Sequence, residues 1–121
     1  MVKTTGPTDP NIITLIRLLK KTAKTENAPI WKRVAAILSN PRRTRPEVNL
    51  SVVNRHSKKG ETVLVPGKVL GAGTLEHSVT IAAVTFSGVA QEKIKQQGGN
   101  CISILDLLTL NPNGSNIRLL K

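Results

Sequence analysis

The sequence predicts a small α/β protein in which N-terminal helices precede a mixed β/α domain. Apolar residues recur at helical spacing before residue 40, and short β-branched runs separated by Gly and Pro follow from residue 48. A chain of 121 residues has the length of one ordinary domain. We therefore expect a single domain over residues 1–121, with basic helices and an arginine segment in 1–47 and a β/α core in 48–121.

The first helix is predicted to run from Pro10 to about Thr25. Asp9 suits the N-cap position, and Pro10 suits the first helical position. One face of this helix is apolar and carries Ile12, Leu15, Ile16, Leu19 and Ala23. The basic residues Arg17, Lys20, Lys21 and Lys24 fall largely off that face. They indicate either a surface for an anionic partner or a solvated helix face.

A second helix is predicted to open at Pro29 and to end at the sequence Ser39-Asn40-Pro41. Its apolar face carries Ile30, Trp31, Val34, Ala35 and Leu38. A lone Trp at apolar helical spacing is typical of a packing residue, so we expect Trp31 in the core rather than against a nucleic-acid base.

The remainder of the chain predicts alternating strands and short helices. The expected strands cover residues 48–50, 62–65, 79–86 and 101–105. Ser51, Ser87 and Asp106 are expected to cap short helices, the first of which should include Lys58 and Lys59 and end at Gly60. The glycines at 67, 71 and 73 indicate a turn or a close backbone approach after the second strand.

The residue inventory offers little support for catalysis or metal binding. One Cys, Cys101, and two His, His56 and His77, cannot provide four Cys and His ligands for zinc. Cys101 lies in an apolar strand, where a buried inert thiol is expected, and the acidic residues are scattered singly. Gly67-Lys68 lacks the other residues of a phosphate-binding loop. We expect no catalytic residue, no metal, no cofactor and no small-molecule substrate.

The charge is large and concentrated in one half of the chain. The sequence has 18 Lys and Arg against 7 Asp and Glu, a formal net charge of +11. Residues 1–59 carry about +10 of it, which is typical of a protein whose partner has dense negative charge. No apolar run is long enough to span a membrane, so we expect no membrane partner. The single Cys101 cannot form an internal disulfide, so we expect a reduced intracellular setting.

The aromatic content narrows the kind of nucleic acid. Trp31 and Phe86 are the only aromatic residues apart from the two His, so the chain lacks the stacking platform of single-strand binders. The backbone of folded RNA or of duplex DNA can instead be held by Lys and Arg alone. We therefore expect a folded nucleic acid as the partner.

The segment Pro41–Pro46 holds three arginines between two prolines, which stiffen the backbone and reduce the entropy lost on binding. We predict that these arginines form the centre of the nucleic-acid surface, the alternative being a solvated loop. The complete predicted contact set is Lys20, Lys21, Lys24, Lys32, Arg33, Arg42, Arg43, Arg45, Arg55, Lys58, Lys59, Gly67 and Lys68. Gly67 is included because its backbone could lie close to RNA without a side chain.

Several short motifs resemble one family in order and spacing. They are Pro29-Ile30-Trp31, Pro41-Arg42-Arg43, Val48-Asn49-Leu50-Ser51, Pro66-Gly67-Lys68-Val69-Leu70-Gly71, Val79-Thr80-Ile81-Ala82-Ala83 and Gly98-Gly99. From about Pro7 to Lys121, the chain resembles the archaeal and eukaryotic large-subunit ribosomal protein L-eighteen-e family, and its length resembles the archaeal members. That family is similar to bacterial ribosomal protein L-fifteen.

The resemblance implies N-terminal helices followed by an irregular superhelix of β-β-α turns. It also implies a structural, non-enzymatic role in translation, with large-subunit ribosomal RNA and neighbouring large-subunit proteins as partners in the cytoplasmic ribosome. A free-standing DNA- or chromatin-binding protein is the alternative, because the same Lys and Arg could hold duplex DNA.

Overall fold

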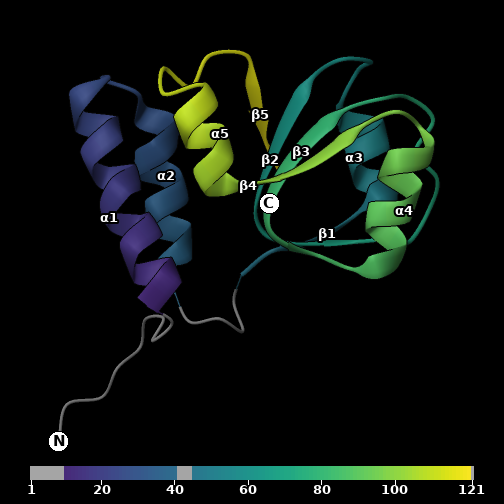
Figure 1. Cartoon of the computed structure of the whole chain (residues 1–121), viewed down its shortest axis with the longest axis horizontal. Coiled ribbons are helices and arrows are strands. Elements are labelled where there is room, and N and C mark those ends of the chain that lie inside the picture. The colour runs from purple at the N-terminus through teal and green to yellow at the C-terminus, as the bar shows by residue number, and fades with distance from the viewer. Residues whose placement is uncertain (1–9, 41–44, 121) are drawn as a thin grey trace, which may run out of the picture.

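The computed structural model describes residues 10–40 and 45–120, and these form a parallel β-sheet with helices on both faces (Figure 1). The helices are α1 (Pro10–Thr25), α2 (Pro29–Leu38), α3 (Leu50–His56), α4 (Gly88–Gln96) and α5 (Ile104–Leu110). The strands are β1 (Glu47–Asn49), β2 (Thr62–Leu70), β3 (Thr80–Phe86), β4 (Asn100–Ser103) and β5 (Ile117–Leu119). The predicted α/β class, with N-terminal helices first, is confirmed.

The two N-terminal helices have the predicted bounds, and they pack against each other. In α2, Trp31, Val34, Ala35 and Leu38 are buried at the expected spacing. Trp31 is fully buried, which confirms it as a core residue. Asp9, the predicted cap of α1, lies outside the described residues.

Strand β2 is the centre of the sheet, because it pairs with three others, all in parallel. Its first residues, Thr62–Leu64, pair with β5, and its last, Lys68–Leu70, pair with β1. The ladder with β3 shifts register between Val65 and Lys68. Pro66 therefore lies where no ladder requires its missing N–H, and the strand continues through it rather than ending at Val65 as predicted.

The sheet is buried on both faces because side chains alternate along each strand. Val63 and Val65 pack into a core that includes residues of α3 and α4. Leu64, between them, packs into a second core formed with α1, α2 and α5. The two helix layers are thus held by successive residues of the same strand.

Some predicted boundaries are wrong for local reasons. Helix α3 follows directly on Asn49, so Ser51 is inside it, and it ends at His56, which leaves Lys58 and Lys59 in a turn. Helix α5 begins at Ile104 because the Ser103 side chain accepts from the Asp106 N–H in a capping box. The predicted strand over 101–105 accordingly ends at Ser103.

Candidate nucleic-acid interface

A groove of about 940 Å³ lies between the start of α2 and strand β5. Arg33 lines it from α2 and Arg118 from β5, and the carboxylate residue Glu61 also lines it. The remaining lining residues are small or apolar apart from one amide: Pro29, Ile30, Gly114, Asn116, Ile117 and Leu119. Two guanidinium side chains from distant parts of the sequence therefore share one groove.

The groove exists because the segment after α5 is fastened to α2. The indole Nε1 of Trp31 donates to the carbonyl of Pro112 over 2.8 Å. Gly114 has a φ of +69°, and a Cβ built on it would lie 2.5 Å from a methyl carbon of Ile30. This close packing requires glycine and directs the chain into β5 beside the first turn of α2.

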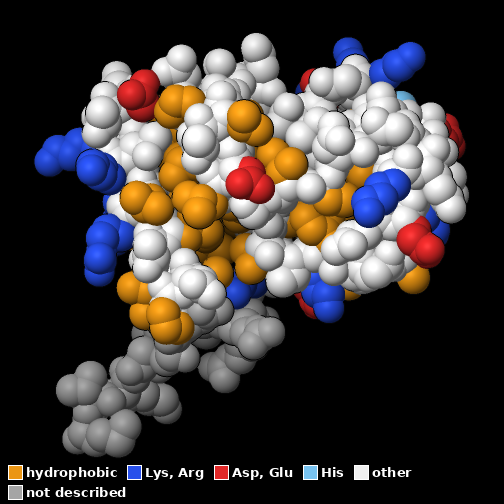
Figure 2. Space-filling model, in the orientation of Figure 1, with side chains coloured by type: hydrophobic (Ala, Val, Ile, Leu, Met, Phe, Trp, Pro, Cys, Tyr) orange, Lys and Arg blue, Asp and Glu red, His pale blue; other side chains and the backbone are white. Residues whose placement is uncertain are grey.

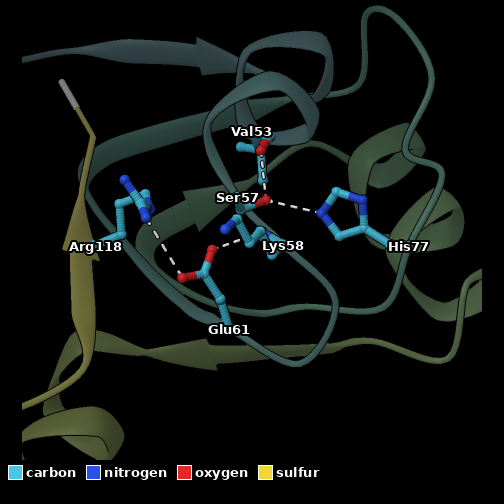
Figure 3. Close-up of polar contacts among 6 residues, drawn as sticks. All are labelled: Val53, Ser57, Lys58, Glu61, His77 and Arg118. Atoms are coloured by element: carbon cyan, nitrogen blue, oxygen red, sulfur yellow. Dashed lines mark hydrogen bonds and ion pairs between the residues drawn. The ribbon is translucent and has the colours of Figure 1, made fainter.

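Glu61 connects the groove to the turn that carries two predicted contact residues (Figure 3). Its Oε1 accepts from the backbone N–H of Lys58 over 2.5 Å, and its Oε2 lies 3.4 Å from Nη2 of Arg118. The Lys58 N–H chiefly, and Arg118 as well, lower the pKa of Glu61 against the opposing effect of burial. The ionised carboxylate thus holds the turn containing Lys58 and Lys59 next to the groove.

The ion pair itself is a positioning contact rather than a major source of stability. The Arg118 and Glu61 side chains are 47% and 32% exposed, and pairs so exposed to solvent are weak. Arg33 and Arg118 bring two positive charges to the groove lining and Glu61 offsets one of them, while Lys58 and Lys59 belong to the turn that Glu61 holds. The balance of charge around the groove is positive and suits a phosphate backbone.

Most of the predicted contact residues are exposed where the structure describes them. Exposed cations are Lys20, Lys21 and Lys24 on α1, Lys32 and Arg33 on α2, Arg55 on α3, Lys58 and Lys59 in the turn, and Lys68 on β2. Arg45 is partly buried. Arg42 and Arg43 lie outside the described residues, so their place at the centre of the surface stays a prediction. In Figure 2 most of the visible basic side chains lie toward the edges of the view, and one lies farther in, over the right-hand part.

Four of the predicted cations lie near the two ends of β2. Lys58 and Lys59 precede the start of this strand, whereas Lys68 lies near its end and its N–H donates to the carbonyl of Pro46, next to Arg45. Lys68 lies six positions after Thr62 along the strand, a span of about 20 Å. Arg45 and Lys68 therefore form a second cationic location, distinct from the groove.

Gly67 has a structural explanation within the chain itself. It is buried, and a Cβ built on it would overlap the carbonyl oxygen of Pro46. The predicted close backbone approach is confirmed, but the approaching group is the segment that leads into β1. We therefore leave Gly67 out of the RNA contacts proposed below.

Sequence reasoning missed Arg118 because it missed β5. This strand has three residues and follows a turn, too short to produce a recognisable alternation. The available signal was the Asn111–Ser115 turn followed by Ile117-Arg118-Leu119, in which one cation stands between two apolar residues. That pattern does not indicate that Arg118 lies beside α2 in the folded protein.

The local structure of Ser57, His77 and Cys101 does not favour a catalytic role. Ser57 is buried, and its Oγ donates to the carbonyl of Val53 over 2.5 Å, so its proton is already used (Figure 3). The Nε2 of His77 lies 2.9 Å from the same Oγ and can donate to it. Burial raises the pKa of the Cys101 thiol, with Lys95 opposing, so the protonated and less reactive form is favoured.

The described part of the chain has neither a cluster of metal-binding side chains nor a helix that could span a membrane. Residues 10–40 and 45–120 contain no group of three or more His, Cys, Asp or Glu side chains that could hold a metal ion. Within the same ranges, no helix combines the length and apolar character needed to cross a membrane.

The fold and charge define a small, strongly basic three-layer α/β protein. Residues 2–121 match the family model described as ribosomal protein 60S L18 and 50S L18e, and the chain belongs to this family of ribosomal proteins. It is 48% identical over 121 residues to the large ribosomal subunit protein eL18 of Methanoregula boonei, and 47% identical to that of Methanothermobacter thermautotrophicus, with both chains fully covered. The eL18 protein of Archaeoglobus fulgidus is 46% identical over 112 residues, which are 93% of this chain and 96% of that protein. The resemblance found in the sequence motifs is thereby confirmed.

Proposed function

We propose that this protein is a structural constituent of the large ribosomal subunit that stabilises folded ribosomal RNA through Lys and Arg contacts to phosphate and sugar. Membership of the ribosomal family supports the place in the large subunit. The mode of binding is inferred from one observation, which is that Arg33 and Arg118 both line the same groove. The protein catalyses no reaction in this role.

The groove suits a nucleic-acid backbone for three reasons. Guanidinium groups form paired hydrogen bonds with phosphate oxygens, and two of them stand on separate walls. The apolar residues of the lining can pack against sugars, and among the residues that line the groove Glu61 is the one carboxylate. The turn holding Lys58 and Lys59 lies beside Glu61 and extends the positive surface past the groove.

The second cationic location extends the proposed RNA surface to the far end of β2. Arg45 and Lys68 lie there, and Arg42 and Arg43 stand three and two positions before Arg45 in the sequence. A separation of about 20 Å spans several phosphates along one strand of RNA, so one folded RNA could contact both locations. The basic residues of α1, Lys20, Lys21 and Lys24, are proposed as peripheral contacts near the start of α2.

A competition experiment tests this function against DNA binding. Labelled protein is incubated with purified large subunits stripped of this protein, in the presence of excess duplex DNA or excess large-subunit ribosomal RNA. We expect co-sedimentation with the subunit at moderate salt, displacement by ribosomal RNA and little displacement by DNA. Equal displacement by both competitors would favour a general nucleic-acid-binding protein instead.

A further inference from the structure

Two large apolar side chains of α5, Leu105 and Leu110, are exposed, although the protein is strongly basic. Within the described ranges, the large hydrophobic side chains with the greatest exposure include Ile13 of α1 at 42%, Leu105 at 46% and Leu110 at 74%. Helices α1 and α5 contact each other. Figure 2 shows apolar side chains gathered in the middle of the view, over α5 and the neighbouring helices. Solvent contact at these residues is costly, so they favour an additional covering surface.

The polar side chains on the exposed face of α5 already form hydrogen bonds within the chain. The hydroxyl of Thr109 donates to the carbonyl of Leu105 over 3.1 Å. The Asp106 carboxylate accepts from the N–H of Ser103 in the capping box. A partner on this face would therefore meet leucine side chains and one carboxylate, with few donors to offer it.

The charge of the segment around α5 is unfavourable for RNA binding. Between Lys95 and Arg118 the sequence has no Lys or Arg, and Asp106 is its only charged residue. RNA phosphates placed on α5 would find no cation on this helix itself and would be repelled by the Asp106 carboxylate. The same features suit a protein surface that presents apolar side chains beside a basic residue.

We propose that the outward face of α5, formed by Leu105, Asp106 and Leu110, binds a segment of another protein. The segment has apolar side chains that cover the two leucines and a Lys or Arg that pairs with Asp106. This contact is separate from the cationic groove, which lies between α2 and β5. The protein then joins RNA on one surface to a protein on another.

Photocrosslinking in purified large subunits tests the proposal. Leu110→p-benzoylphenylalanine places the reactive group on α5, and Val89→p-benzoylphenylalanine is the control, because Val89 is 54% exposed on α4 across the sheet. Both positions are exposed, so neither substitution disturbs the core. Co-sedimentation of both variants with the subunit is scored before irradiation and tests the proposed function separately.

We expect the α5 variant to form an adduct that resists ribonuclease and contains a protein segment with a Lys or Arg close to the crosslinked residue. An adduct with RNA, no adduct in subunits that contain the variant, or the same protein adduct from position 89 would overturn the proposal. Adding Asp106→Asn keeps a capping acceptor but removes the charge, and should lower the adduct yield about two- to five-fold. An unchanged yield would contradict the proposed pairing with Asp106.

Discussion

The indole N–H of Trp31 and the carbonyl of Pro112 are joined by a 2.8 Å hydrogen bond across 81 positions of the sequence. Trp31 is fully buried in the core that α1, α2 and α5 share with one face of the sheet. The bond fixes the loop that follows α5 against the first turn of α2. It therefore determines where β5 begins and brings Arg118 to the groove that Arg33 lines.

Removing the Trp31 side chain should destabilise the whole fold. Trp31→Ala leaves a cavity and an unpaired Pro112 carbonyl, and we expect a loss of about 3–5 kcal/mol in the free energy of unfolding. Trp31→Phe keeps most of the packing but loses the donor, so a loss of about 1–3 kcal/mol is expected. Urea unfolding followed by far-ultraviolet circular dichroism measures both. A Trp31→Ala variant as stable as the wild type would show that this contact does not hold the two segments together.

Gly67 should be intolerant of any side chain because of the Pro46 carbonyl. Gly67→Ala is expected to cost at least about 2 kcal/mol, since either β1 or β2 must move and the Lys68 N–H bond to Pro46 is lost. Gly88→Ala is the matched control: no atom lies within 4 Å of its Cβ position, and it begins a helix. That control should be neutral or stabilising by up to about 1 kcal/mol. Similar melting temperatures for the two variants would contradict the structural role of Gly67.

The sequence indicated that the glycine segment allows close backbone approach, but not which backbone approaches. If the backbone at Gly67 lay close to RNA, as the sequence allowed, Gly67→Val would impair RNA assembly and leave the melting temperature near normal, whereas loss of both would indicate a structural glycine. The structure favours the second outcome, because the pairing of β1 with the end of β2 places Pro46 on Gly67. That pairing depends on contacts between segments about twenty residues apart, which local patterns do not encode.

Local signals were reliable where one strong feature marked a boundary. Pro29 opens α2 as predicted, and the Ser87 side chain caps α4 by accepting from the Ala90 N–H. Local signals failed at the start of α5, where two residues could each serve as the N-cap. Both Ser103 and Asp106 can cap α5, and only the capping box between them shows that Ser103 holds the N-cap position. The groove could not be predicted because its walls meet through tertiary packing of α2 against the segment before β5.

The contribution of Glu61 to stability should depend on pH. Its pKa is lowered from the ordinary value of 4.5, so the folded state favours the ionised form. The contribution is therefore present above the pKa of the unfolded chain and is lost as pH falls through the lower pKa of the folded protein. We expect Glu61→Gln to be less stable than the wild type at neutral pH, and the difference to disappear in acid.

Urea unfolding of both proteins across the acidic range measures this difference, with Glu92→Gln on α4 as a control for the loss of one carboxylate. A Glu61→Gln deficit that grows as the pH falls would mean that the carboxylate is not stabilised by Lys58 and Arg118.

The Glu61→Gln variant should also bind RNA at least as tightly as the wild type at neutral pH, because a negative charge leaves the groove.

The salt dependence of binding to large-subunit ribosomal RNA tests the central claim most directly. If Arg33 and Arg118 each contact a phosphate, Arg33→Gln combined with Arg118→Gln should flatten the slope of log K against log salt by about 1.5. Lys95→Gln, on α4 across the sheet from the groove, should leave the slope as it is. Thermal melting confirms that each variant is folded. A double variant with the wild-type slope, or an equal change per charge at Lys95, would contradict the assignment of the groove to RNA.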